Sequence, residues 1–433
     1  MKNHLKAWKK QYQEIEITER EFNQAIEAGM QKAVKRHRRK QLGIIPSVTI
    51  AVILLSLILI INASPTFAAQ MAKIPGMERI IELVQFDKGK TAAIENDYYQ
   101  AINRSVTKGD ITFTLDGVIR DENGLVLFYT ITSANELHDV WIEENSITND
   151  NGEEMLDDMT SYGSLDEENR GTMEYYTKEE PIEFDNFVFH GEIVGTEILD
   201  DGRRQQVREN ISIDFHAENT KEAIHYQIDK TVMVEGQKIH VNSVTIQPLR
   251  TTVNLYADPD NEMKILAFDD LAIVDQKGED WSSMSNGIVS TDNPEDESYH
   301  LYLQSNYFEQ PTSLTLKLSK VQAVEREHDY FRFDLDNEEI LYDPYDMFFD
   351  MSYEYGELSL SMHARDDFGT FVFGDVFDLN GDKLEESYNT QGVRVDDKVR
   401  KFMYTINTTE PIVDVQIVGY PNWLEEEIEI PLK

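Results

Sequence analysis

The residues whose types and spacing are best suited to chemistry are acidic and lie beside glycines. Asp378-Leu-Asn-Gly-Asp-Lys383 has the closely spaced oxygen ligands of a calcium loop. An EF-hand also needs more ligands, a Glu at the twelfth position and flanking helices, which the sequence does not supply here. The segment therefore predicts a hairpin turn, as do Asp121-Glu-Asn-Gly124 and Asn149-Asp-Asn-Gly152.

Residue types that catalyse reactions or bind metals show no recognised arrangement. The chain has no cysteine, which excludes thiolate ligands and cysteine nucleophiles. Its outer histidines are scattered without an HExxH spacing, no Gly-x-Ser-x-Gly elbow occurs, and no carboxylate pair stands out. We predict no enzyme, no catalytic residue, no metal site and no cofactor; an exported hydrolase would need a carboxylate-lined cleft. Acidic clusters such as 294–297 predict solvated loops, with weak Ca²⁺ binding as the alternative.

One uncharged stretch, Leu42–Asn62, decides where the rest of the chain must lie. A helix of that length spans roughly 30 Å, the thickness of the bilayer's hydrocarbon core. Six basic residues lie within 32–40, whereas 63–77 contain only Lys73. The positive-inside rule predicts a cytoplasmic N-terminus and an outer C-terminal part in a single-pass membrane protein. A cleaved signal peptide is the alternative, because 63–69 are rich in small residues.

Charge differs between the two sides of this stretch. Residues 1–41 carry 11 Lys and Arg against 5 Asp and Glu, and the remainder carries 29 against 76. The basic tail suits anionic lipid headgroups of the bilayer. The acidic outer part argues against binding to nucleic acid, since phosphates would be repelled. It is compatible with plain solubility, with cation binding, or with adaptation to high salt or high pH.

The N-terminal tail has the signals of one amphipathic helix. Thr18 and Glu21 form a capping box, with the Thr18 side chain and the Glu21 side chain each accepting from the other's backbone N–H. Phe22, Ile26 and Met30 follow at helical spacing on one apolar stripe. A tail this short cannot bury that stripe internally. We expect a cytosolic protein partner to cover it, with the inner membrane surface and a plain spacer as alternatives.

The outer part reads as helical near the membrane and as β beyond it. Helices are expected from Met77 and over 91–103, and short alternating runs separated by Asn, Asp and Gly turns begin near Asp110. Similar runs open at residues 111, 239 and 358, and sections close alike at 211–215, 330–335 and 428–432. The predicted fold is a mainly β ectodomain of two or three tandem β-sandwich-like domains, behind a single transmembrane helix and a short helical tail.

The expected domain boundaries follow from these patterns. They are 1–41 for the cytoplasmic tail, 42–62 for the transmembrane helix, 63–107 for a juxtamembrane helical segment, and 108–222, 223–343 and 344–433 for three β domains.

Several segments resemble a Gram-positive family of membrane-anchored regulators. They are Asn62-Ala-Ser-Pro-Thr-Phe-Ala-Ala69, Ile74-Pro-Gly76, Ala92-Ala-Ile-Glu-Asn-Asp-Tyr98 and Ile111-Thr-Phe-Thr-Leu-Asp-Gly-Val118. The stretch from Gln237 through Tyr256 is similar to an uncharacterised β domain that often follows in that family. The resemblance implies an ectodomain of unknown function and an anti-sigma-factor-like role toward extracytoplasmic-function sigma factors. The zinc site of some anti-sigma factors needs cysteine and cannot exist here.

We therefore expect a single-pass regulator of the cell membrane. Its tail helix, through Phe22, Ile26 and Met30, would bind a cytosolic sigma factor, and its acidic ectodomain would sense the state of the envelope. The alternative is a cell-surface structural or ligand-binding protein that engages cell-wall polymer, divalent cations or a neighbouring protein. In that case the tail would serve only as an anchor.

Overall fold

The computed structural model describes residues 77–433 with several internal gaps. The residues left undescribed within that range are 156–158, 163–164, 167, 178–180, 199–202, 220, 283–288, 294–296, 364–367, 369–371, 385–386, 390–392 and 395–398. Met1–Pro75 and Gly76–Lys433 are separate units of the chain. The predicted tail and the predicted membrane segment both belong to the first unit and lie outside the described residues.

Two short helices precede the β structure. Helix α5 spans Met77–Val84 and helix α6 spans Lys88–Glu95. Asp87 caps α6, because its side chain accepts the backbone N–H of Lys90 at 2.9 Å. The helix expected over 91–103 ends at Glu95, and strand β1 (Gln100–Lys108), rich in β-branched residues, follows. No helix in the part of the chain that the structure describes is long and apolar enough to cross a bilayer.

The first domain, residues 100–217, is a pair of antiparallel sheets. Sheet A has the order β1-β2-β3-β6-β5 and sheet B the order β4-β7-β8. Phe113 of sheet A stacks on Phe189 of sheet B with ring centroids 5.4 Å apart, so the sheets share one core. The strands after β1 are β2 (Ile111–Arg120), β3 (Gly124–Ser133), β4 (Glu136–Asn149), β5 (Met159–Tyr162), β6 (Arg170–Tyr176), β7 (Asn186–Ile198) and β8 (Arg204–His216).

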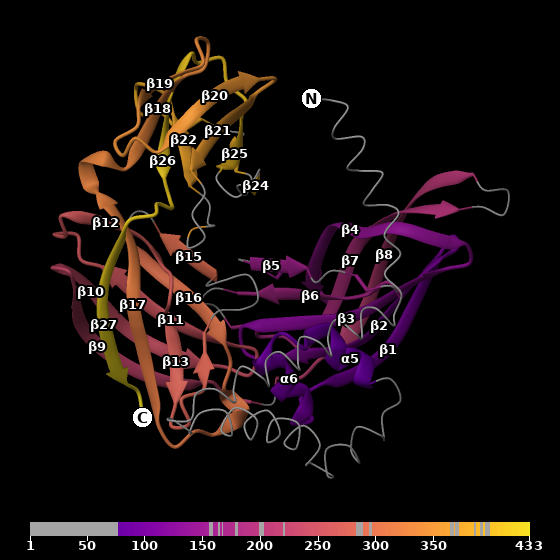
Figure 1. Cartoon of the computed structure of the whole chain (residues 1–433). Coiled ribbons are helices and arrows are strands. Elements are labelled where there is room, and N and C mark those ends of the chain that lie inside the picture. Colours follow the sequence, from indigo (N-terminus) through magenta and orange to yellow (C-terminus); the bar gives the residue numbers. More distant parts are fainter. Residues whose placement is uncertain are drawn as a thin grey trace, which may run out of the picture. The chain divides into compact units, whose positions relative to one another are not determined.

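The second domain, residues 224–325 together with 423–431, repeats this arrangement (Figure 1). Sheet C has the order β15-β16-β11-β10-β9, and sheet D contains β12-β17-β13-β14 with β27 beside β17. Phe268 of sheet D packs edge-on against Tyr299 of sheet C at 5.3 Å. The strands are β9 (Ile224–Val234), β10 (Gln237–Ile246), β11 (Arg250–Ala257), β12 (Met263–Phe268), β13 (Ala272–Asp275), β14 (Asp280–Trp281), β15 (Val289–Asn293), β16 (Ser298–Gln304), β17 (Leu314–Glu325) and β27 (Trp423–Pro431).

The third domain, residues 330–417, has its own core between two further sheets. Sheet F has the order β19-β18-β26-β22, and sheet G has β20-β21-β25-β23 with β24 beside β25. Phe373 of sheet F lies edge-on to Phe402 of sheet G at 6.2 Å. The strands are β18 (Tyr330–Asp334), β19 (Glu339–Tyr342), β20 (Phe348–Glu354), β21 (Glu357–His363), β22 (Phe373–Phe377), β23 (Ser387–Asn389), β24 (Val393–Arg394), β25 (Val399–Ile406) and β26 (Ile412–Ile417).

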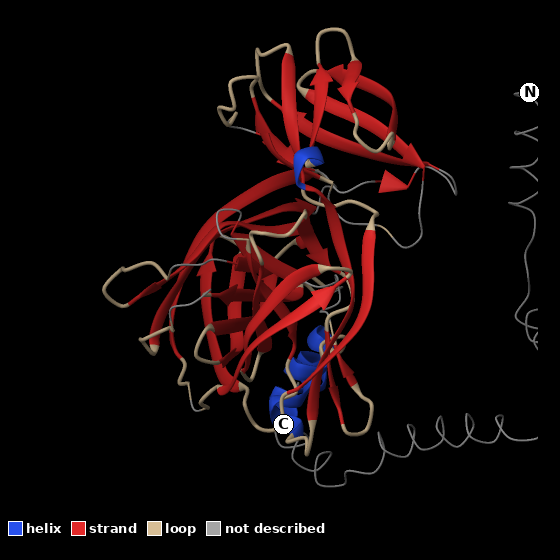
Figure 2. Cartoon of the chain, turned by 90° about the vertical axis from the view of Figure 1, so that its left-hand side faces the viewer, coloured by secondary structure: helices blue, strands red, loops and turns tan. Residues whose placement is uncertain are grey.

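The prediction of a mainly β protein is confirmed (Figure 2). The repeat is also visible in the strand order, since sheets A and C have equivalent orders and β4 pairs with β7 as β12 pairs with β17. In the third domain β22 pairs with β26 in the same way. The openings at 111 and 239 fall in the equivalent strands β2 and β10, whereas the opening at 358 falls in β21, the equivalent of β3 and β11.

The closing strands of the second and third domains are exchanged. In the first domain β8 pairs with β7, its neighbour in sequence. The strand after β17 is β18, but β18 pairs with β26 of the third domain. Strand β27, which follows β26, returns to pair with β17 of the second domain. The expected boundary at residue 343 therefore lies inside the third domain's core, where Phe331 and Phe348 pack edge-on at 5.1 Å.

Four turns share one local structure, and they begin at Asn149, Asp166, Asp275 and Asp378. In each, the first residue's Oδ1 accepts the backbone N–H groups two and four residues later, at 2.7–3.0 Å. The residue three positions later has a positive φ of 54–87°, and it is Gly in three of the four turns. The hairpin turns predicted at 149–152 and 378–383 are confirmed by the pairings Thr148–Glu154 and Phe377–Lys383.

Candidate functional site

The predicted site residues of the tail lie outside the described residues. This applies to the partner-binding residues Phe22, Ile26 and Met30 and to the helix cap Thr18 and Glu21. They therefore stay predictions. The candidate site described below is built from α6 and the β domains alone.

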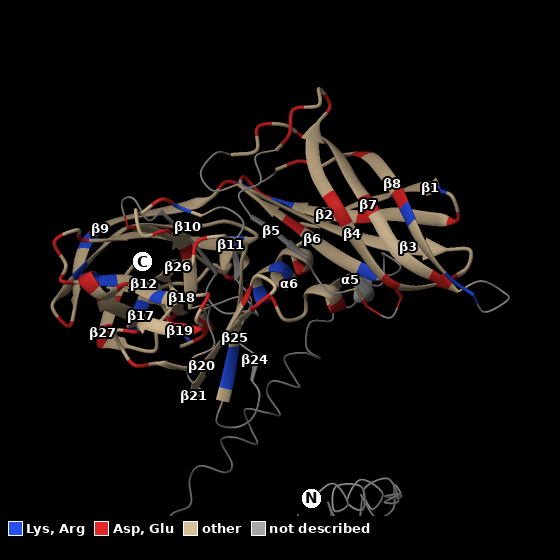
Figure 3. Ribbon diagram, turned by 90° about the horizontal axis from the view of Figure 1, so that it is seen from above, with Lys and Arg blue, Asp and Glu red and all other residues tan. Residues whose placement is uncertain are grey.

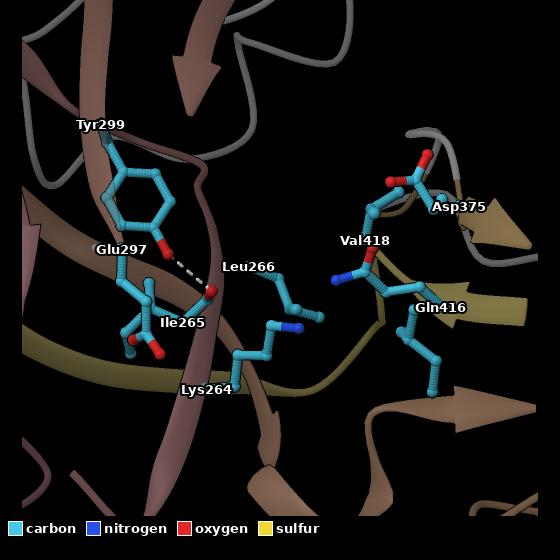
Figure 4. A pocket seen from close by; sticks show the side chains of 10 residues that line it. Lys264, Ile265, Leu266, Glu297, Tyr299, Asp375, Gln416 and Val418 are labelled. Atoms are coloured by element: carbon cyan, nitrogen blue, oxygen red, sulfur yellow. Dashed lines mark hydrogen bonds between the residues drawn. The ribbon is translucent and has the colours of Figure 1, made fainter. Parts of the chain in front are cut away.

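A cavity of about 200 Å³ lies between β12 and the third domain (Figure 4). Its charged side chains are paired within the protein. The Lys264 ammonium lies 2.7 Å from Asp329 Oδ2, and Glu297 accepts from Arg326. The Tyr299 hydroxyl donates to the carbonyl of Ile265 at 2.8 Å. The Lys264 and Glu297 bonds tie the second domain to residues 326–329, which lead into the third domain, and the Tyr299 bond lies within the second domain. The polar groups of this cavity therefore serve the structure.

A second cavity of about 350 Å³ lies against the outer face of sheet D. Two of its acidic side chains, Asp270 and Glu429, also have structural partners. Asp270 accepts the backbone N–H groups of Ser319 and Lys320 at 2.9 and 2.8 Å, and Lys317 pairs with Glu429. Among the described residues, no three His, Asp or Glu side chains gather as metal ligands.

The junction between the first and second domains contains a buried charged cluster. Lys90 of α6 is 4% exposed, and its ammonium lies 2.7 Å from both carboxylate oxygens of Glu174 in β6. Asp87 Oδ2 lies 3.0 Å from the same ammonium, and the Tyr176 hydroxyl donates to Glu174. Burial alone lowers the pKa of Lys90, but Glu174, Tyr176 and Asp87 together raise that pKa well above its ordinary value.

Helix α6 is held from the second domain as well. The backbone N–H of Lys88 donates to Gln304 Oε1 at 3.0 Å. Gly89 lies so close to Ser305 that a Cβ atom on it would fall 2.8 Å from the Ser305 nitrogen. The close approach requires glycine, because any side chain would collide with backbone. The helix therefore contacts both domains along its short length.

Arg250, at the start of β11, joins the two domains beside this cluster. Its guanidinium lies between the rings of Tyr176 and Tyr302, 4.4 and 4.2 Å from their centroids. Its Nη2 donates to the carbonyl of Thr177 in the first domain at 2.7 Å. Only 2% of Arg250 is exposed, so the ring faces replace the water that the cation loses.

Asp121 closes the same junction from the first domain. Its backbone N–H donates to Gly124, which confirms the turn predicted at 121–124. Its carboxylate is buried and accepts the backbone N–H of Leu249 in the second domain at 2.9 Å and that of Asn123 at 3.1 Å. Burial raises the pKa of Asp121 to about 6, against the opposing effects of these N–H groups and of Arg250.

A cleft of about 310 Å³ opens at this junction. It is lined mainly by uncharged hydrogen-bonding side chains, with Glu122 and Arg250 as the charged ones. The Gln247 amide donates to Asn123 Oδ1 at 2.7 Å across the junction. The lining residues are Glu122, Asn123, Pro181, His225, Thr245, Gln247, Arg250, Thr252, Asn254 and His300.

The arrangement is suited to binding. The cleft has donors and acceptors held in place by mutual hydrogen bonds, and its volume falls within the range of small-molecule sites, roughly 300–1,000 Å³. The buried cluster beside it fixes α6 and both domains in one geometry.

Sequence reasoning did not find these residues. Lys90 and Glu174 are 84 positions apart, and Asp121 and Leu249 are 128 apart. No motif marks them, and the sequence predicts Asp121 only as a turn residue. The one local signal was the Lys88-Gly-Lys90 sequence at the start of α6, where two cations flank a glycine on a short helix.

Comparisons with known proteins place two uncharacterised regions on this chain. Residues 37–133 match a domain of unknown function (DUF4179), and residues 223–349 match a family of unknown function (DUF5643). The segments that resemble membrane-anchored regulators, within 62–118 and 237–256, lie inside these two matches. An uncharacterised domain is thus confirmed, while the link to anti-sigma factors stays a prediction.

No curated protein gives a significant match to the chain. One solved structure, described as "the conserved domain protein from Bacillus anthracis", aligns with 81% of this chain and 98% of its own. The two share 14% sequence identity at a TM-score of 0.37. A TM-score of that size does not establish a common fold.

Proposed function

We propose that the protein is a single-pass membrane regulator of the anti-sigma-factor-like kind. Residues 42–62 cross the cell membrane, and the basic tail lies in the cytoplasm, where its helix binds a sigma factor. The acidic β domains lie outside and receive a signal from the envelope. The charge asymmetry around the uncharged stretch and the capped, amphipathic tail support this orientation and role.

The observation that carries the proposal is the position of α6. This helix comes soon after the predicted membrane segment, and it is clamped by Glu174 of the first domain and by Gln304 and Ser305 of the second. A change in the geometry of the two domains would therefore displace α6. Packed interfaces switch between discrete arrangements, so such a displacement of α6 could carry a signal from the two domains toward the membrane segment.

On the inner side, the proposal assigns the tail a role of contact. Phe22, Ile26 and Met30 would fill a groove on the sigma factor and occlude its working surface. Truncating one such anchor to alanine costs roughly 2 kcal/mol of binding at interface hot spots. The double change Phe22→Ala with Ile26→Ala should then release the partner at cellular concentrations.

The test is capture of the full chain, with a C-terminal affinity tag, from membranes of the source cell. The native chain should retain a sigma factor, and the Phe22/Ile26 double alanine should lose it and change transcription of the dependent genes. Gln24→Ala with Gln31→Ala is the matched control, because both side chains project from the opposite face of the predicted helix.

Retention of the partner and unchanged transcription in the double alanine would contradict the proposal. Absence of any cytosolic partner in the native sample would shift the weight to a surface-binding protein with the tail as anchor.

A further inference from the structure

The outer face of sheet C differs in charge from the outer faces of sheets B and D. Its core-facing side chains, such as Val244, Val253 and Leu301, belong to the second domain's core. The alternate positions lie on the other side of the sheet and form three rows across β9, β10, β11 and β16, in which Thr252 and Tyr302 are buried. The rows are His225–Thr245–Thr252–Tyr302, Gln227–Ser243–Asn254–His300 and Thr231–His240–Tyr256–Ser298.

None of these twelve positions is Asp, Glu, Lys or Arg, in a chain of which 28% is charged. Strand β16 has no charged residue, β10 and β11 have one each, Lys238 and Arg250, and β9 has Asp229 and Lys230. Figure 3 shows the Lys and Arg residues of the chain in blue and its Asp and Glu residues in red. The outer faces of sheets B and D are different. They carry the ion pairs Arg208–Glu143, at 2.8 Å, and Lys317–Glu429.

The side chains of this face hold one another in fixed orientations. Asn254 donates to the Ser243 hydroxyl at 3.1 Å, and its Oδ1 lies 2.8 Å from His300 Nδ1. The Thr245 hydroxyl lies 3.2 Å from His225 Nδ1. Amide, hydroxyl and imidazole groups each have more than one hydrogen-bonding position, so these bonds orient the groups without exhausting them.

The face also carries a stacked aromatic pair. The rings of His240 and Tyr256 stack with centroids 4.3 Å apart and planes 16° from parallel. His240 is fixed by the Thr231 hydroxyl at 2.8 Å and by Asp258 at 3.0 Å. Stacking covers one face of each ring, so the face of Tyr256 turned away from His240, on the side of Ser298, is the one that can pack against a ligand.

At one end the face runs into the 310 Å³ cleft. His225, Thr245 and Asn254 belong to both the rows and the cleft lining. The first domain adds the Asn123 amide and the apolar ring of Pro181. The cleft thus presents mainly uncharged groups from two domains, with Glu122 and Arg250 as its charged members.

We infer that this face and its cleft bind an uncharged glycan. Sugar rings combine hydroxyl groups, which are both donors and acceptors, with C–H faces that pack on aromatic rings. Fixed amides, hydroxyls and imidazoles match the first property, and the His240–Tyr256 pair matches the second. A polyanion would lack cations on the rows and would meet a molecule of net charge −41. A cationic chain would find no carboxylate on the rows.

The inference rests on the proposed function only in placing these domains outside the cell, where polysaccharide is met. It names the chemical class of ligand for the signal-receiving side. Binding is measured without the tail's partner, so a failure here leaves the tail hypothesis standing, and the converse also holds.

The test uses the full chain in lipid nanodiscs and a hexamer of β-1,4-linked N-acetylglucosamine as the neutral probe, with binding followed by calorimetry. Asn254→Ala and Tyr256→Ala should each weaken binding at least about tenfold, a loss of about 1.4 kcal/mol. Lys317→Ala, on the outer face of sheet D, is the matched control and should change affinity less than about twofold. Affinity should also be insensitive to salt between about 50 and about 500 mM, because no ion pair is involved.

Absence of binding by the native chain would overturn the inference. So would an affinity of both variants equal to that of the native chain, with unchanged melting temperatures. Preference for polygalacturonate over the neutral probe would overturn it in favour of an anionic ligand. A self-association that Tyr256→Ala abolishes would show that the face is instead an interface between two copies.

Discussion

Lys90 offers the most decisive test of how the junction is held. The change Lys90→Met removes the ammonium and leaves Glu174 and Asp87, whose side chains are 13% and 14% exposed, without their cation. Removing one partner of a buried ion pair costs about 3–5 kcal/mol, because the remaining charge is neither hydrated nor paired. We expect a loss of this size in the stability of α6 and β6.

The assay is hydrogen exchange of the α6 amides, which reports the free energy of local opening. A global unfolding curve would be less informative, since three cores need not unfold as one unit. Lys90→Met should lower the opening free energy by about 3–5 kcal/mol. The double change Lys90→Met with Glu174→Gln should recover about half of that loss, because the uncompensated charge is reduced.

The matched control is Lys317→Ala, which breaks an exposed ion pair with Glu429, side chains 44% and 62% exposed. Its cost should be about 0–1 kcal/mol and confined to sheet D. The raised pKa of Lys90 sets the pH range. The stabilisation is fully present below the unfolded-state pKa of about 10.4 and is lost only as pH rises through the higher folded-state pKa. An α6 exchange rate in Lys90→Met equal to the native rate would refute the reasoning.

Three further predictions concern single positions. Gly89→Ala should destabilise the junction by about 1–3 kcal/mol, because its Cβ meets Ser305 backbone, and amide exchange in α6 would show it; an unchanged rate would contradict the close approach. The raised folded-state pKa of Asp121, about 6, predicts that its contribution to stability falls as pH rises from about 4 to about 6 and is constant above that. The stability difference between the native chain and Asp121→Asn, from urea unfolding at several pH values, should therefore change within that range and be flat above pH 7; a flat profile throughout would count against it. Asp378→Ala should lower the free energy of unfolding by about 1 kcal/mol, because the backbone N–H groups of Asn380 and Asp382 lose their acceptor. The loss should be the same with and without Ca²⁺. A melting temperature of the native chain that rises with Ca²⁺, and no such rise in Asp378→Ala, would restore the calcium-loop interpretation.

The local features of the fold could be predicted from the sequence, because each depends on a few adjacent residues. The turns at 121–124, 149–152 and 378–383 follow from an Asp or Asn whose side chain caps the backbone and from a glycine that adopts positive φ in the last two. The alternation of Ile111-Thr-Phe-Thr-Leu115 is sufficient to indicate a strand with one buried face, as β2 has.

The sequence also determined where charge lies along the chain, and with it the predicted tail, membrane segment and outer part. It did not determine which closing strand pairs with which domain. The strands Tyr330–Asp334 and Trp423–Pro431 are both antiparallel partners in the structure, the first of β26 and the second of β17. Judged by its alternating pattern alone, either strand could pair with β17 or with β26. The choice depends on burial summed over two cores, which no local pattern records.

The candidate site was decided by tertiary structure for the same reason. Lys90 meets Glu174, and Asn254 meets His300, only because strands distant in sequence lie side by side. Each strand of sheet C contributes a few uncharged residues that are unremarkable in isolation, and the uncharged face exists only once the register aligns them. Composition determined that this protein would be acidic, and folding decided which surface would not be.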